Sequence, residues 1–154
     1  MKYSNKVLQY FKKPKNFGKI QNYDGLGKIG NIVCGDVIWF YIKVGKNKKK
    51  EDIIKDIKFE TYGCVSAISS SSIVTEMVIN KTITEAIKIS KNDIIKALDG
   101  LPQIKVHCAI LSVDALHEAI YDYLKKSKKP IPKQLLDKHN KIIKTSKKND
   151  ISKK

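Results

Sequence analysis

At 154 residues and 42% hydrophobic, the chain has enough apolar material for one compact core, and its length argues against a second full domain. It has no apolar run of roughly 20 residues that would span a bilayer and no signal-like segment, so we expect a cytoplasmic protein with no membrane partner. The net charge of +16 comes from lysine alone, because the chain contains no arginine. Sequence-specific nucleic-acid recognition is therefore disfavoured, since base readout and phosphate clamps rely on the guanidinium fork.

The N-terminal part predicts a short helix followed by a glycine-rich segment. Ser4 can cap an amphipathic helix that runs to Lys12 and ends before Pro14. Residues 17–35 hold five of the eight glycines. Because glycine marks turns and loops, we expect mostly loop there, with room for one edge strand.

Two β-branched and aromatic runs follow and predict an antiparallel hairpin. The first covers residues 36–44, a charged turn covers residues 45–52, and the second run includes Ile57, Phe59 and Thr61. The second strand should end near Gly63. Its end would then bring Cys64 to the edge of the sheet.

The middle of the chain predicts four helices. The first contains four consecutive serines, small residues that permit close packing although they are mediocre helix formers. Thr82 with Glu85 forms a capping-box pattern for the second helix, and either Ser90 or Asn92 can cap the third. The expected ranges are 67–79, 82–89, 90–98 and 108–125, and the last should pack on the sheet.

The C-terminal part is lysine-rich: residues 125–154 carry twelve lysines against two aspartates. Residues 127–132 form a helix-breaking stretch after the last long helix. We therefore divide the chain into a domain of residues 1–126 and a Lys-rich C-terminal extension of residues 127–154. We expect this extension to be disordered and solubilising. The alternatives are a docking arm for an acidic partner, or one more helix that packs on the body. That helix would use Leu135, Leu136, Ile142 and Ile143.

The three cysteines are far apart in sequence and cannot all pair, so a disulfide framework is a poor interpretation. Each lies at a joint between predicted elements: Cys34 before the first long strand, Cys64 between strand and helix, and Cys108 at the start of the last long helix. A helix start stabilises a thiolate, and Lys105 adds a nearby cation, so Cys64 and Cys108 should both be nucleophilic. A lone cysteine is more often buried and structural, but three at joints favour chemistry.

Thiolates prefer zinc, copper(I) or iron–sulfur clusters, and three of them need a fourth ligand. Asp36 and His107 are the candidates, whereas His117 and His139 should do no more than cap or pack. One oxygen ligand on widely spaced loops makes an exchangeable site suited to release. A stable zinc site of three cysteines and Asp36 remains open on spacing alone.

The sequence resembles the family of IscU and NifU-type iron–sulfur cluster assembly scaffolds. Three motifs in the right order carry the resemblance over roughly residues 1–125. They are Val33-Cys34-Gly35-Asp36, the stretch from Phe59 to Cys64 followed by Ala67-Ile68-Ser69, and the stretch from Leu101 to Cys108 followed by Ile110-Leu111.

The resemblance implies an α/β (α+β) fold with a three-stranded antiparallel sheet, helices on one face and a cluster site at one tip. It implies a scaffold rather than an enzyme, which accepts sulfur from a cysteine desulfurase, iron, and electrons from a ferredoxin-type donor. The transient [2Fe–2S] cluster would then pass to apo iron–sulfur acceptor proteins. The alternative is a zinc-binding protein that acts as a sulfur-acceptor accessory.

Carried over to this chain, the resemblance makes Cys34, Cys64 and Cys108 cluster ligands and Cys108 the persulfide acceptor. Asp36 would be a ligand or tune release, and His107 would be an alternative fourth ligand. The stretch through which the family docks a dedicated Hsp70-type chaperone has Gln103 in place of a second proline. That departure weakens the expectation of this partner.

Overall fold

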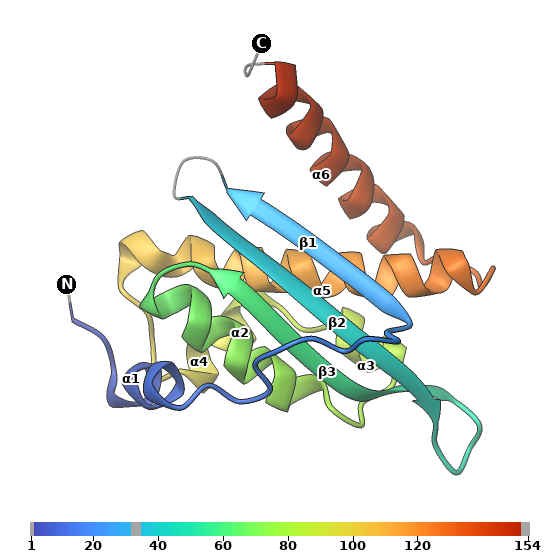
Figure 1. Cartoon of the computed structure of the whole chain (residues 1–154), viewed down its shortest axis with the longest axis horizontal. Coiled ribbons are helices and arrows are strands. Elements are labelled where there is room, and N and C mark those ends of the chain that lie inside the picture. The colour runs from blue at the N-terminus through green and yellow to red at the C-terminus, as the bar shows by residue number, and fades with distance from the viewer. Residues whose placement is uncertain (1, 32–34, 152–154) are drawn as a thin grey trace.

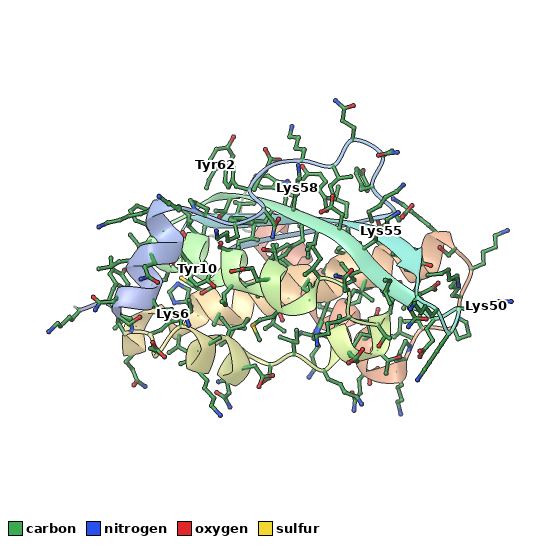
Figure 2. The ribbon with its side chains drawn as sticks, turned by 90° about the horizontal axis from the view of Figure 1, so that it is seen from below. Lys6, Tyr10, Lys50, Lys55, Lys58 and Tyr62 are labelled. Atoms are coloured by element: carbon green, nitrogen blue, oxygen red, sulfur yellow. The ribbon has the colours of Figure 1, made fainter. Side chains whose placement is uncertain are left out.

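The computed structural model describes residues 2–31 and 35–151 and shows a three-stranded antiparallel sheet with helices on one face (Figure 1). The segment between the first helix and the first strand crosses the opposite face of the sheet (Figures 1 and 2). Along the chain the elements are α1 (Asn5–Lys12), β1 (Gly25–Asn31), β2 (Asp36–Lys46), β3 (Asp52–Tyr62), α2 (Val65–Val78), α3 (Ile83–Ile87), α4 (Lys91–Ala97), the 3-10 turn η1 (Gln103–Lys105), α5 (Val106–Lys126) and α6 (Lys133–Ile151).

The predicted hairpin is confirmed as β2 and β3, which pair antiparallel with Phe40 opposite Phe59. β3 begins at Asp52, the last residue of the predicted charged turn, and contains Ile57, Phe59 and Thr61 of the predicted run. Its inward-facing side chains, which include Ile54 and Ile57, are fully buried against the helices. Together with the helices, the sheet confirms the predicted α+β class.

The glycine-rich segment contains the one edge strand for which the sequence left room, β1. The strand order of the sheet is β1-β2-β3, and α5 packs directly on β1. A Cβ atom on Gly27 would lie 2.1 Å from the carbonyl oxygen of Ala115 and 2.4 Å from the backbone nitrogen of Ala119. Glycine is needed in this strand because only a residue without a side chain lets the backbone of α5 approach so closely.

The helix ends follow the predicted caps. The Ser4 hydroxyl accepts a hydrogen bond from the Val7 amide, and Thr82 forms a reciprocal capping box with Glu85. Of the two candidates for the next cap, Ser90 is the one used, and Asp93 completes its capping box. The cap is a matter of local spacing, which explains why the sequence could predict it.

The serine-rich helix α2 packs between α1 and α5, and its five serines are fully buried. The hydroxyl of Ser69 donates to the backbone carbonyl of Val7 in α1, and Ser71 contacts Ser112 in α5 at 3.3 Å. Small side chains therefore permit the close packing, and the hydroxyls of Ser69 and Ser71 find partners on the neighbouring helices, whereas those of Ser66 and Ser70 have no hydrogen-bond partner.

The outer strand β3 is lined with lysines. Figure 2 shows Lys50, Lys55 and Lys58 in a row along the strand and the turn before it. Charged side chains on an edge strand oppose pairing with another chain. This role of the lysines explains part of the net positive charge of the chain without requiring a bound ligand.

The C-terminal extension differs from its expected disorder, because residues 133–151 form α6. Leu135 is only 2% exposed. Lys138 pairs with Asp114 of α5 at 2.8 Å, and the His139 imidazole contacts Glu118 of α5 at 2.6 Å. The alternative in which the extension forms one more helix therefore describes the structure, but two of its four proposed contact residues, Leu136 and Ile143, are more than a third exposed. The division of the chain at residue 126 stays a prediction.

Within residues 2–31 and 35–151, no helix combines the length and the apolarity needed to traverse a bilayer.

Candidate functional site

Three elements that are distant in sequence bring their ends to one tip of the molecule. Asp36 is the first residue of β2, Cys64 is the N-cap of α2, and Cys108 is the third residue of α5. Because β3 pairs with β2 and α2 follows β3 after only two residues, the hairpin register fixes Cys64 beside Asp36. The tip lies at the left of Figure 1, where α5 begins.

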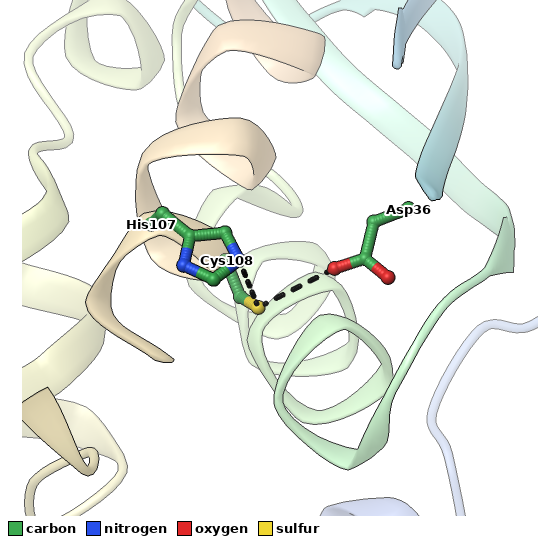
Figure 3. A group of neighbouring side chains, drawn as sticks. All are labelled: Asp36, His107 and Cys108. Atoms are coloured by element: carbon green, nitrogen blue, oxygen red, sulfur yellow. Dashed lines mark hydrogen bonds between the residues drawn. The ribbon is translucent and has the colours of Figure 1, made fainter. Parts of the chain in front are cut away.

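The side chains at this tip are within contact distance of one another. The Cys108 sulfur lies 3.6 Å from the Cys64 sulfur, 3.7 Å from Oδ2 of Asp36 and 3.7 Å from Nε2 of His107. Figure 3 shows Asp36 and His107 on opposite sides of the Cys108 sulfur. The ligand atoms of Asp36, His107 and Cys108 all lie within 4.8 Å of one another, close enough to hold one metal ion.

Two glycines shape the backbone around the carboxylate. Gly35 has a φ of +72°, a left-handed conformation that turns the chain directly into Asp36. A Cβ atom on Gly63 would lie 2.6 Å from the Cβ of Ala67 and 3.2 Å from Oδ1 of Asp36. The absence of a side chain at Gly63 therefore leaves room for the first turn of α2 and for the carboxylate. The sequence interpretation used Gly63 only as the end of a strand and missed this role, which depends on a tertiary contact.

The pKa values of the two thiols are shifted in opposite directions. A hydrogen bond from Cys108 lowers the pKa of the Cys64 thiol to about 5, against the opposing effect of burial, and backbone amides at the start of α2 lower it further. The same contact raises the pKa of the Cys108 thiol, as do burial and the negative charges of Cys64 and Asp36. The contact between the two sulfurs therefore shifts their pKa values in opposite directions.

Lys105 lies close enough to the tip to interact with it electrostatically. The pKa of its ammonium is raised, chiefly by the negative charge of Cys64, with smaller effects of Cys108 and Asp36. Lys105 thus supplies the nearby cation that the sequence suggested. It is the last residue of η1, directly before α5.

Of the predicted site residues, Asp36, Cys64, His107 and Cys108 lie together at the tip, and their roles as ligands stay a prediction. Cys34 lies outside the described residues. His117 and His139 lie instead at the contact between α5 and α6, away from the thiols. Cys64 and Cys108 are free thiols despite their proximity.

The donor set at the tip combines two soft sulfurs with one carboxylate oxygen and one imidazole nitrogen. Sulfur and imidazole suit iron or zinc, whereas the hard oxygen is the weaker partner of such ions. Asp36 is only 5% exposed and Cys108 is fully buried, so a bound ion would be largely shielded from water. The arrangement fits a metal or a small metal–sulfur group better than an isolated nucleophile.

Comparison with known proteins gives consistent matches over most of the chain. The family model described as "NifU-like N terminal domain" matches residues 2–130. An iron–sulfur cluster assembly scaffold protein, IscU 1 of Archaeoglobus fulgidus, is 50% identical over 127 residues, which are 82% of this chain and 80% of that protein. The scaffold protein IscU of Aquifex aeolicus is 45% identical over 124 residues, 80% of this chain and 77% of that protein.

A solved structure supports the same fold. The N-terminal part of a nitrogen-fixing NifU-like protein from Brucella abortus superimposes with a TM-score of 0.64 at 16% identity, covering 80% of this chain and 94% of that one. At that identity the likeness concerns the fold alone. The family model ends at residue 130, three residues before α6 begins.

Proposed function

The chain belongs to the family of NifU-like N-terminal domains, and on that premise we propose that it is a scaffold on which a transient [2Fe–2S] cluster is assembled and then passed to apoproteins. The cluster is the cargo of this process and not a resident cofactor. The relatives are named assembly scaffolds, which supports a carrier role.

One observation carries the proposal: three potential ligands lie around the Cys108 sulfur, which is itself a fourth, and the four come from three separate elements. Asp36, Cys64 and His107 each have a ligand atom within 3.7 Å of that sulfur. Cys34 would join them as the third thiolate, two residues before Asp36. Three thiolates with one oxygen or nitrogen ligand complete the four protein ligands that a two-iron cluster needs.

Cys108 is the proposed acceptor of sulfur from a cysteine desulfurase. Its sulfur attacks the outer sulfur of the persulfide on the desulfurase, the S–S bond of that persulfide breaks, and the desulfurase cysteine leaves as a thiolate. The Cys108 thiol must lose its proton for this step. The Cys64 sulfur at 3.6 Å, and Oδ2 of Asp36 and Nε2 of His107 at 3.7 Å, are the groups within reach of that proton.

Asp36 is the proposed ligand that tunes release. A carboxylate oxygen binds iron less firmly than a thiolate does, and it offers an entry point for a ligand of the acceptor protein. His107 is the alternative fourth ligand, since its Nε2 lies as close to the Cys108 sulfur as the Asp36 oxygen does. Ferrous iron and electrons from a ferredoxin-type donor complete the cluster.

The test is anaerobic reconstitution of the full chain with ferrous iron, cysteine, a reductant and a cysteine desulfurase. The expected result is visible absorption and a Mössbauer spectrum of a [2Fe–2S] centre, with two iron and two sulfide per chain or per pair of chains. Transfer to an apo-ferredoxin should then follow. Reconstitution that yields neither absorption nor sulfide would contradict the proposal.

A second candidate is a zinc protein that serves as a sulfur-acceptor accessory. The observation in its favour is the donor set itself, because two thiolates with Asp36 also suit tetrahedral zinc. Metal analysis separates the two candidates. Tight zinc that is retained during reconstitution, with no visible absorption, would favour the accessory.

The reaction needs reduced thiols, so we expect it in the cytoplasm, where cysteines stay free. The free state of Cys64 and Cys108 at 3.6 Å agrees with such an environment. A dedicated Hsp70-type chaperone is a weaker expectation because of Gln103.

A further inference from the structure

A positively charged groove lies along α1 and the segment that follows it. The groove has a volume of about 460 Å³ and is lined by Lys6, Gln9, Tyr10, Lys12, Lys13 and Lys15. Figure 2 shows Lys6 and Tyr10 on α1, at the end of the molecule opposite the turn that carries Lys50. We refer to this feature as the α1 groove. Its lining includes none of the tip residues Asp36, Cys64, His107 and Cys108.

The walls of the α1 groove are held by the body of the protein. Val7 of α1 is fully buried, and the Ser4 hydroxyl donates a hydrogen bond to the Leu98 carbonyl. Beyond the helix, the Lys15 amide donates to Ser72 at 2.6 Å and the Asn16 side chain donates to Thr75 at 2.9 Å, both in α2. A ligand would therefore meet a preformed backbone, which lowers the ordering cost of binding.

The lysines of the α1 groove are not neutralised by the protein. Elsewhere on the described surface lysines pair with aspartates, as Lys46 does with Asp52 and Lys126 with Asp122. No ion pair of the described residues includes Lys6, Lys12, Lys13 or Lys15. Among the lining residues, Tyr10 has an acidic partner, because its hydroxyl is hydrogen-bonded to Glu76. Four cations therefore face a concave surface with one nearby carboxylate.

We propose that the α1 groove binds an acidic segment of a partner protein. Ammonium groups are point charges that pair with side-chain carboxylates from many directions, and a concave surface of one sign concentrates oppositely charged partners. Nucleic acid fits less well, because single strands are held largely by exposed aromatic faces on which bases stack. The one aromatic ring of the lining, Tyr10, is half-buried and has its hydroxyl bonded to Glu76.

This inference extends the proposed function without depending on it. The lining of the α1 groove shares no residue with the tip, so we expect an acidic segment to bind in the presence or absence of metal at Cys108. Attraction of this kind mainly increases the rate of encounter and weakens with salt. The groove would thus recruit partners while the tip remains free for chemistry.

The test is fluorescence anisotropy with a labelled peptide of ten glutamates and the full chain, at about 50 mM and about 200 mM salt. The double variant Lys12→Glu/Lys13→Glu should weaken binding roughly tenfold or more, since it replaces two attractive charges by two repulsive ones. The matched control is Lys141→Glu/Lys144→Glu, which makes the same change in net charge on two exposed residues of α6. It should weaken binding by no more than about twofold.

Equal loss in both double variants would overturn the proposal, because it would show a general effect of net charge. Absence of peptide binding to the parent would do the same. A single-stranded DNA of ten nucleotides that binds more tightly and displaces the peptide would assign the groove to nucleic acid instead. The milder variant Lys12→Gln/Lys13→Gln, with a circular dichroism melt for each protein, guards against loss of folding and should show a smaller loss in the same direction.

Discussion

The sulfur atoms of Cys64 and Cys108 lie 3.6 Å apart, although 44 positions separate the two residues. The contact joins the start of α2 to the first turn of α5, and Oδ2 of Asp36 lies 3.7 Å from the Cys108 sulfur. Two thiols this close titrate as a coupled pair, in which the pKa of Cys64 is lowered and that of Cys108 is raised.

Replacement of Cys108 by serine should abolish desulfurase-driven assembly, to below roughly a tenth of the parent rate, because a hydroxyl does not replace the thiolate as acceptor of sulfur. Mass spectrometry of the persulfide after reaction with a desulfurase provides the measurement. Cys34→Ser is the matched variant and should retain a persulfide on Cys108. A persulfide found mainly on Cys34 or Cys64 in the parent protein would show that the acceptor has been assigned to the wrong residue.

Asp36→Ala should make the assembled cluster longer-lived and slow its transfer to an apo-ferredoxin, by roughly tenfold. The reason is that the exchangeable oxygen ligand is lost while the thiolates remain. Decay of the visible absorption after addition of the acceptor measures the rate. Asp137→Ala, which removes an exposed carboxylate of α6, should behave like the parent. Faster loss of the cluster from Asp36→Ala would instead make Asp36 an essential stabilising ligand.

Gly27→Ala should lower the free energy of unfolding by about 3 kcal/mol, because the added methyl would collide with backbone atoms of α5 that cannot move aside easily. Gly30→Ala is the control in the same strand. Its Cβ atom would lie 3.6 Å from the nearest heavy atom, an ordinary contact, so the expected change is below about 1 kcal/mol. Urea unfolding of both variants makes the comparison, and equal midpoints would refute the close approach of α5 to β1.

Leu135→Ala should lower the free energy of unfolding by about 2 kcal/mol or more, since the side chain is 2% exposed and its removal leaves a cavity between α6 and the body. Leu136, its neighbour in α6, is 38% exposed, and its replacement by alanine should cost less than about 1 kcal/mol. Neither variant should change cluster assembly. If both melt at the temperature of the parent, α6 does not contribute to the stability of the fold.

Acidification from about pH 6.5 to about pH 4 should destabilise the protein through His117. Burial, followed by the charge of Lys138, lowers the pKa of this imidazole from 6.5 to about 4. In this range the unfolded chain binds a proton that the folded chain does not. The free energy of unfolding therefore decreases as the pH is lowered, by about 3 kcal/mol at most. The raised pKa of Glu118 acts in the opposite sense, so the measured quantity is the difference between the parent and His117→Gln. That difference should change over this range, and a constant difference would show that His117 titrates normally.

Much of the fold follows from patterns within short stretches of sequence. The hairpin is visible in its two β-branched runs, and the capping boxes at Thr82 and Ser90 are visible in three-residue spacings. Cys64 and Cys108 could be placed at helix starts for the same reason, because the ends of elements are local features. The position of Asp36 at the beginning of a strand also follows from the run of residues after it.

For the C-terminal extension, patterns within short stretches of sequence did not predict the structure. Its lysine content is typical of disorder, yet α6 is anchored by Asp114 and Glu118, which lie more than 20 positions earlier in α5. The partners of a charged residue are set by packing and not by composition. For the same reason the sequence could not show that Gly27 supports α5.

The sequence by itself determined the element order, the joints that carry the cysteines and the types of ligand available, because these depend on residues a few positions apart. Only the tertiary structure decided that Asp36, Cys64 and His107 meet within 4 Å of the Cys108 sulfur, and in which direction the pKa of each thiol shifts. The pKa of a thiol depends on its distance from other charges and on its burial, and both quantities exist only once the chain has folded.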